Sequence, residues 1–157
     1  ATTDDGFLVS YVGETGSSFR DRHVAHVQWW LSGYYWVFDA EKFQRGQVEK
    51  VWDGIVNPNA PQRMSEVIHK HASIAPKIAS FLDVLQVMVA PFENDRRLRR
   101  RAEGSIYRQI RDCGSEKAKS FLQRGDRYWY RRDEEEQINL NISSPITIVG
   151  LDNDLEA

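Results

Sequence analysis

The strongest constraint on the fold is a change of periodicity within residues 6–33. Residues 6–13 place apolar side chains alternately on two faces, a pattern typical of a β-strand. Thr15-Gly16-Ser17 predicts a turn. Ser18, with Asp21 three residues later, predicts the capped start of a helix. The segment therefore predicts a strand, a tight turn and a helix in direct succession.

The rest of the chain alternates irregularly between extended and helical patterns, which predicts an α+β fold with a small central β-sheet flanked by helices. The first helix is expected to end at Gly33. Strands at 6–13, 34–38 and 47–52 are expected to form one sheet, with the helix at 18–32 packed against it. The remaining expected elements are a helical turn at 39–46, helices at 65–82, from Asn94 to about Gly114 and at 116–123, and strands at 84–91 and 145–151.

Domain organisation follows from length and composition. A chain of 157 residues, 41% of them hydrophobic, predicts one domain over 1–157, with 143–157 as a C-terminal extension or a substitute strand. The sequence has no apolar run of about 18 residues and no signal-peptide pattern, so neither a membrane span nor a membrane partner is expected. Its one cysteine, Cys113, can form no internal disulfide, which favours a reducing cytoplasm.

Charge is distributed very unevenly, although the net charge is only −2. Residues 96–132 carry 13 Lys and Arg against 4 Asp and Glu, whereas residues 133–157 carry none against 7. Because a ligand meets the local field, this pattern allows a polyanionic partner. The alternative is that the basic and acidic stretches neutralise each other within the fold.

Four side chains suited to phosphodiester chemistry lie either near the predicted turn or on a later predicted helix. Arg22 and His26 lie four residues apart and so share one face of the first helix, close in sequence to the phenol of Tyr11. A guanidinium can grip a phosphate through two hydrogen bonds, and a phenol or an imidazole can transfer a proton. Glu103 lies within the later, arginine-rich helix.

Tyr11-Val12-Gly13-Glu14-Thr15, followed by Arg22 and His26, resembles the second half of the signature of the GIY-YIG nucleases. The resemblance implies a metal-dependent DNA endonuclease in which a helix glutamate, here Glu103, binds a single Mg²⁺ or Mn²⁺. It also implies that an asparagine closes the site, for which Asn139 or Asn141 is the candidate.

The resemblance further implies a role for each matched residue. Arg22 would neutralise charge in the transition state, and Tyr11 would orient or activate water with the help of His26. Because these chemistries act on one phosphate, Tyr11, Arg22, His26 and Glu103 are expected to line one cleft. DNA backbone contacts are expected from arginines near Glu103, namely Arg97, Arg99, Arg100 and Arg101.

One departure from the family pattern supports a second hypothesis. The family's first strand, Gly-Ile-Tyr, is not found, because Gly6-Phe7-Leu8 lies too close to Tyr11 and lacks the tyrosine. Three explanations stay open: the strand precedes the given sequence, a segment such as 145–151 replaces it, or it was never present. The alternative function is therefore a catalytically impaired GIY-YIG-like module that binds nucleic acid or protein.

Overall fold

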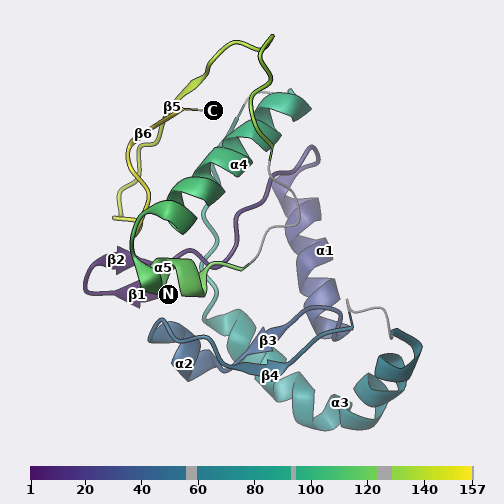
Figure 1. Ribbon diagram of the computed structural model, residues 1–157. Helices are drawn as coiled ribbons and strands as arrows, with labels where there is room; N and C mark the ends of the chain where they lie inside the picture. The colour runs from purple at the N-terminus through teal and green to yellow at the C-terminus, as the bar shows by residue number, and fades with distance from the viewer. Residues whose placement is uncertain (56–59, 93–94, 124–128, 157) are drawn as a thin grey trace. The chain divides into compact units, whose positions relative to one another are not determined.

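The computed structural model describes residues 1–55, 60–92, 95–123 and 129–156, apart from the side chains of residues 60–64. These residues form two compact units (Figure 1). The first unit comprises Ala1–Gly16 and Val89–Ala157, and the second comprises Ser17–Met88. Both combine helices with short strands, so the α+β class is confirmed. The assignment of 1–157 to a single domain stays a prediction.

The second unit begins with helix α1 (Phe19–Leu31), whose ends match the sequence signals. Ser18 accepts a hydrogen bond from the backbone N–H of Asp21, 3.1 Å away, and its hydroxyl donates to the Asp21 carboxylate. After the helix, Gly33 has a φ of +70° and donates its N–H to the carbonyl of Trp30. Local capping therefore sets both ends of α1.

A β-hairpin and two helices complete this unit: β3 (Val37–Phe38), α2 (Ala40–Gln44), β4 (Lys50–Trp52) and α3 (Ala60–Asp83). β3 and β4 pair antiparallel, and α2 lies in the segment that joins them. Asp39 caps α2 by accepting a hydrogen bond from the backbone N–H of Lys42. Both the hairpin and α2 pack on α3, where the Phe81 ring lies 5.6 Å from that of Phe38 on β3 and 5.0 Å from that of Phe43 on α2. The buried indole of Trp52 donates to the carbonyl of Gly33 at 2.7 Å.

Helix α4 (Arg96–Asp112) is the central element of the first unit. It precedes α5 (Glu116–Phe121), and the hairpin of β5 (Asn139–Asn141) and β6 (Asp154–Glu156) runs beside it (Figure 1). Ala102 of α4 is buried with Leu140 and Leu155 of that hairpin. The two-residue strands β1 (Thr2–Thr3) and β2 (Gly6–Phe7) form a separate hairpin.

The prediction of one central sheet is wrong. The described residues form three separate two-stranded sheets, in which β2 pairs with β1, and β3 pairs with β4. Of the expected strand at 6–13, only Gly6–Phe7 is extended and paired as a strand. Alternation indicates which face a side chain takes, but a strand forms only where another backbone supplies hydrogen bonds.

Two further predicted strands are also corrected. Residues 84–91 form no strand, and Val87, Met88 and Val89 are about half exposed. Residues 145–151 contribute only an isolated parallel bridge from Ile148 to Phe7, flanked by backbone hydrogen bonds from Phe7 and Val149.

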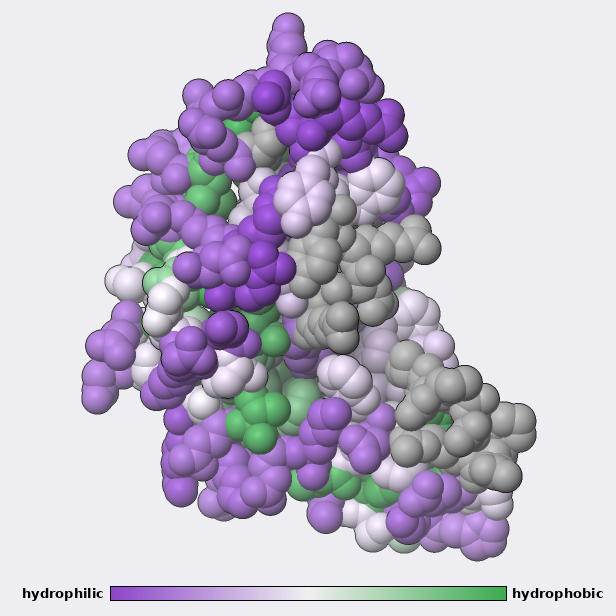
Figure 2. Space-filling view, viewed as in Figure 1, coloured by the Kyte–Doolittle hydropathy of each residue, from purple (hydrophilic) through white to green (hydrophobic). Residues whose placement is uncertain are grey.

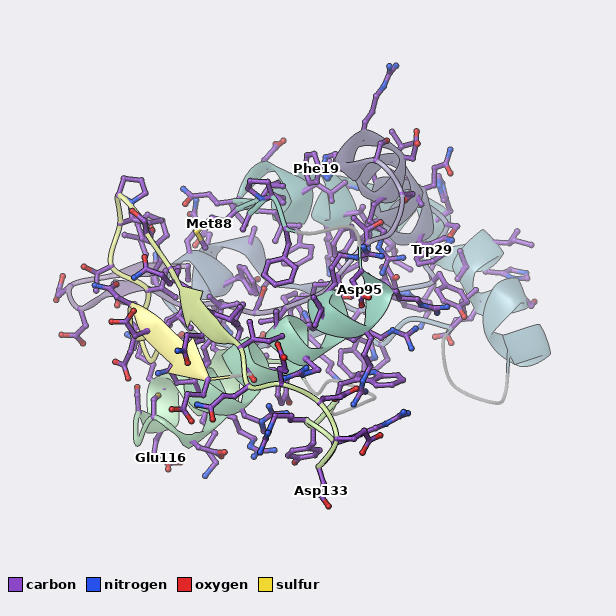
Figure 3. The ribbon with its side chains drawn as sticks, turned by 90° about the horizontal axis from the view of Figure 1, so that it is seen from above. Phe19, Trp29, Met88, Asp95, Glu116 and Asp133 are labelled. Atoms are coloured by element: carbon purple, nitrogen blue, oxygen red, sulfur yellow. The ribbon has the colours of Figure 1, made fainter. Side chains whose placement is uncertain are left out.

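The remaining helix predictions are largely confirmed. The predicted cap Asn94 lies outside the described residues, and Asp95, at the start of α4 in Figure 3, caps the helix through Leu98 N–H. α3 starts earlier than expected, at Ala60, and continues past Pro76. In the described part of the chain, no helix combines the length and apolar character needed to cross a bilayer.

The environment of Gly33 yields a prediction about stability. An added Cβ at Gly33 would lie 3.0 Å from a methyl group of Val67, whereas at Gly114, also with positive φ, it would meet nothing within 4 Å. We expect Gly114→Ala to cost about 1 kcal/mol from backbone strain alone, and Gly33→Ala about twice that because it adds a steric clash. Urea unfolding of both variants measures the difference, and equal costs would contradict the assigned contact.

Candidate active site

Tyr11 lies in an irregular segment of the first unit, and its side chain is 51% exposed. Its ring folds over Gly13, where an added Cβ would lie 2.5 Å from the phenol oxygen. Residue 13 must therefore be glycine for the tyrosine to adopt this position. The phenol is held close to its own backbone and remains accessible to solvent.

Glu14 joins this segment to the start of α4. Its carboxylate accepts a hydrogen bond from Arg99 Nε at 3.1 Å and forms an ion pair with Arg100 Nε at 3.5 Å. Gly16 also lies against Arg99, because an added Cβ would be 3.0 Å from its guanidinium. Glu103 is one helical turn beyond Arg99, so the Tyr11 segment and the Glu103 helix are held together within the first unit.

Arg22 and His26 lie one turn apart on α1, in the second unit. The Arg22 guanidinium carbon is 6.0 Å from the centre of the Trp29 ring. The His26 ring contacts three aromatic rings, with centroid separations of 5.6 to 5.9 Å; these belong to Trp29, Trp30 and Tyr35. Figure 3 shows Trp29 and Phe19 on this helix.

The electrostatic setting of His26 favours a neutral imidazole. Burial lowers the pKa of His26 below its usual value of 6.5, and the positive charges of Arg22 and His23 lower it further. A neutral imidazole at neutral pH can accept a proton. His23, by contrast, is exposed, and its ring stacks on that of Phe19 with 5.6 Å between the ring centroids.

The four residues that were expected to converge are therefore divided between the two units. Tyr11 and Glu103 belong to the first unit, and Arg22 and His26 belong to the second. Within each unit, the elements that carry its two residues are held together. That all four line one cleft stays a prediction.

The arginines expected to contact DNA pair with carboxylates of this chain, and their contact with DNA stays a prediction. Arg99 and Arg100 share Glu14, and Arg97 donates to Glu135 through Nε at 2.6 Å and Nη2 at 3.0 Å. Neutralisation between the basic and acidic stretches, the alternative interpretation of the charge distribution, accounts for the Arg97–Glu135 pair, whereas Glu14 lies outside the acidic stretch. Glu135 belongs to the acidic stretch, and its side chain is only 18% exposed.

Arg101 is the most deeply buried of the set, with a side chain 2% exposed. It donates to the Glu136 carbonyl at 2.7 Å and lies 3.7 Å from the Glu135 carboxylate. With Glu135 in place this guanidinium is shielded from solvent, so the structure gives no support to the expected DNA contact. Its role here is to hold the chain around residues 135–136 against α4.

The donor set can be compared with the metal that the resemblance implies. Among the described residues, no three His, Cys, Asp or Glu side chains gather so that they could hold an ion. Half-buried Glu103 is a single carboxylate, which suits Mg²⁺ or Mn²⁺ held by one carboxylate, water and substrate phosphate. It does not suit zinc, which needs three or four protein ligands.

Asn139, the candidate for closing the site, lies exposed on β5 opposite Glu156. The neighbouring candidate Asn141 donates its side-chain amide to Asp154 at 2.9 Å. Both residues belong to the first unit. The sequence identified these positions but missed the ion pairs of Glu14 and Glu135, which join segments 85 and 38 residues apart in the chain.

Comparison with protein-family models, curated proteins and solved structures finds no match to this chain. The family resemblance therefore rests on the residues of the signature alone.

The burial of His26 predicts how this ring titrates. Its NMR titration midpoint should lie below 6.5 and should rise in Arg22→Gln, because that change removes a repulsive charge. Since the pKa is lower in the folded state, the His26 contribution to stability is present above about pH 6.5 and is lost as pH falls through the folded pKa. A midpoint at or above 6.5 would contradict the burial of the ring.

Proposed function

We propose that this chain is a metal-dependent DNA endonuclease of the GIY-YIG type. The observation that carries the proposal is the Tyr11–Gly13 segment followed in the chain, after residues 14–18, by α1, which presents Arg22 and His26 one turn apart. Two features of the structure support it. Tyr11 is accessible beside a glycine that its ring requires, and Glu14 links the same segment to the helix of Glu103.

The proposed chemistry is hydrolysis of a phosphodiester bond by water, leaving a 5′-phosphate and a 3′-hydroxyl, as the resemblance implies. Arg22 binds the phosphate and offsets the charge that grows on its oxygens in the transition state. Either Tyr11 or neutral His26 orients the attacking water and takes its proton. Glu103 would hold Mg²⁺ or Mn²⁺, which would supply charge neutralisation at the cleaved phosphate.

A second candidate is a module that binds nucleic acid without cleaving it. The specific observation in its favour is the arrangement of the strands, because the described residues lack the central sheet that the family resemblance implies. Cleavage assays separate the two functions. The purified protein is incubated with supercoiled, linear and branched DNA in Mg²⁺, in Mn²⁺ or in EDTA, and cleavage that EDTA stops supports the enzyme.

Glu103→Gln tests the role of the carboxylate. The change removes a ligand charge at nearly constant volume, so it should abolish metal-dependent cleavage while the circular dichroism spectrum and DNA binding in EDTA stay close to wild type. Glu116→Gln is the control, because Glu116 is an exposed glutamate at the start of α5, labelled in Figure 3. Full cleavage by Glu103→Gln would reject the assignment.

Arg22→Ala tests stabilisation of the transition state. Losing one charge-stabilising donor should reduce the single-turnover cleavage rate about 10²- to 10³-fold. Arg20→Ala is the matched control, since Arg20 is an exposed arginine on the same helix, two residues earlier. Equal rates for the two variants would show that Arg22 has no special role.

Salt dependence tests binding to the phosphate backbone. Affinity for DNA, measured in EDTA, should fall with rising salt by a log–log slope of about −0.9 for each phosphate that is neutralised. Replacing Arg99 and Arg100 with Ala should flatten the slope if these side chains contact phosphates. Affinity that does not change with salt would exclude an electrostatic interface.

A further inference from the structure

Glu135 sits in a set of donors that is chemically suited to phosphate. Its carboxylate receives two hydrogen bonds from the Arg97 guanidinium, at 2.6 and 3.0 Å, and one from the backbone N–H of Arg132, at 2.9 Å. Arg101 adds a second guanidinium at 3.7 Å. A forked guanidinium contact and a backbone amide are the groups that proteins use to bind phosphate oxygens.

The arginines of this set are held in place by groups other than the carboxylate. Arg97 Nη2 donates to the carbonyl of Tyr130 at 2.6 Å, and its guanidinium carbon lies 5.0 Å from the centre of the Trp129 ring. Arg101 donates to the carbonyl of Glu136 at 2.7 Å. Rotation of the Glu135 side chain alone would therefore leave the cationic donors positioned for another anion.

The site also has an accessible side. Side chains of Arg97 and Glu135 are 24% and 18% exposed, so the pair lies at the protein surface, whereas Arg101 forms the inner wall. Asp133, labelled in Figure 3, points away from α4 at the turn that precedes Glu135. The end of the unit where α4 begins is covered by hydrophilic residues in Figure 2.

We propose that Arg97, Arg101 and the backbone N–H of Arg132 form an anion-binding site, that Glu135 occupies it in the free protein, and that a DNA backbone phosphate displaces Glu135. The second part of this inference rests on the proposed function, whereas the first does not. Glu135 then acts as an internal competitor for phosphate. Nucleic acid gains access to Arg97 only by exchange with this carboxylate.

Chemical rescue tests the anion site without DNA. Glu135→Ala removes the carboxylate, so its melting temperature should fall, and inorganic phosphate should raise it again by binding the vacated donors. Sodium chloride at equal ionic strength is the control for screening. Phosphate should not raise the melting temperature of the wild type to the same extent. Rescue by chloride equal to that by phosphate would overturn the anion site.

Displacement by DNA is tested with a neutral isostere. Glu135→Gln should bind DNA about tenfold more tightly than wild type at low salt, because the competing charge is gone, and its salt dependence should be steeper. Glu134→Gln is the matched control, since that side chain is 71% exposed and lies 4.0 Å from Arg132. It should change affinity less than twofold.

The outcomes separate this inference from the proposed function. If wild type binds DNA and Glu135→Gln binds no more tightly than Glu134→Gln, displacement is wrong and the proposed function is unaffected. If no variant binds DNA while phosphate rescues Glu135→Ala, the anion site stands and the DNA-directed function fails. Should Glu135→Gln not fold, the Arg97 Nε–H signal of the wild type must shift on addition of DNA, and an unchanged signal overturns displacement.

Discussion

The first unit depends on guanidinium groups of α4 that bind carboxylates and carbonyls from distant parts of the chain. Glu14 is held by Arg99 and Arg100, and Glu135 is held by Arg97 and Arg101. Removing a charged side chain from water is costly unless it gains a partner, so each of these pairs constrains the segment that carries its carboxylate. Together with the hydrogen bonds from Arg97 and Arg101 to the carbonyls of Tyr130 and Glu136, these pairs hold the Tyr11 segment and residues 130–136 against the helix.

Arginine suits this role better than lysine. The planar fork of Arg97 holds both oxygens of Glu135, and its flat face lies on the Trp129 ring, which an ammonium group could not do as well. The hydrogen bond from Arg97, followed by that from Arg132 N–H, lowers the pKa of Glu135 to about 2. Glu135 therefore contributes stability above about pH 4.5, and the contribution is lost as pH falls toward 2.

Features governed by near neighbours in the chain could be predicted from the sequence, and those governed by distant partners could not. The capping of α1 by Ser18 and its end at Gly33 each depend on residues within one turn. Pairing of strands is not local. The apolar run at 84–91 forms no strand, whereas β5 and β6 each have one apolar residue in three and pair through their backbones. The same limit applies to the site: Tyr11, Arg22, His26 and Glu103 resemble parts of a sequence signature, but the spacing of residues along a chain does not give their positions in space.

The ion pairs of α4 also change what a basic helix means for binding nucleic acid. Arginines that are free in solution release counterions from DNA, and each phosphate contact then contributes fully to the salt dependence. An arginine that exchanges a carboxylate for a phosphate leaves behind an exposed carboxylate, which takes up cations from solution. Part of the counterion release is thereby cancelled, so such contacts add less affinity and a weaker salt dependence than a count of arginines suggests. The charge that matters for binding is the net charge left after the internal pairs have formed. In this unit Glu14 and Glu135 reduce the positive charge that α4 offers to a ligand.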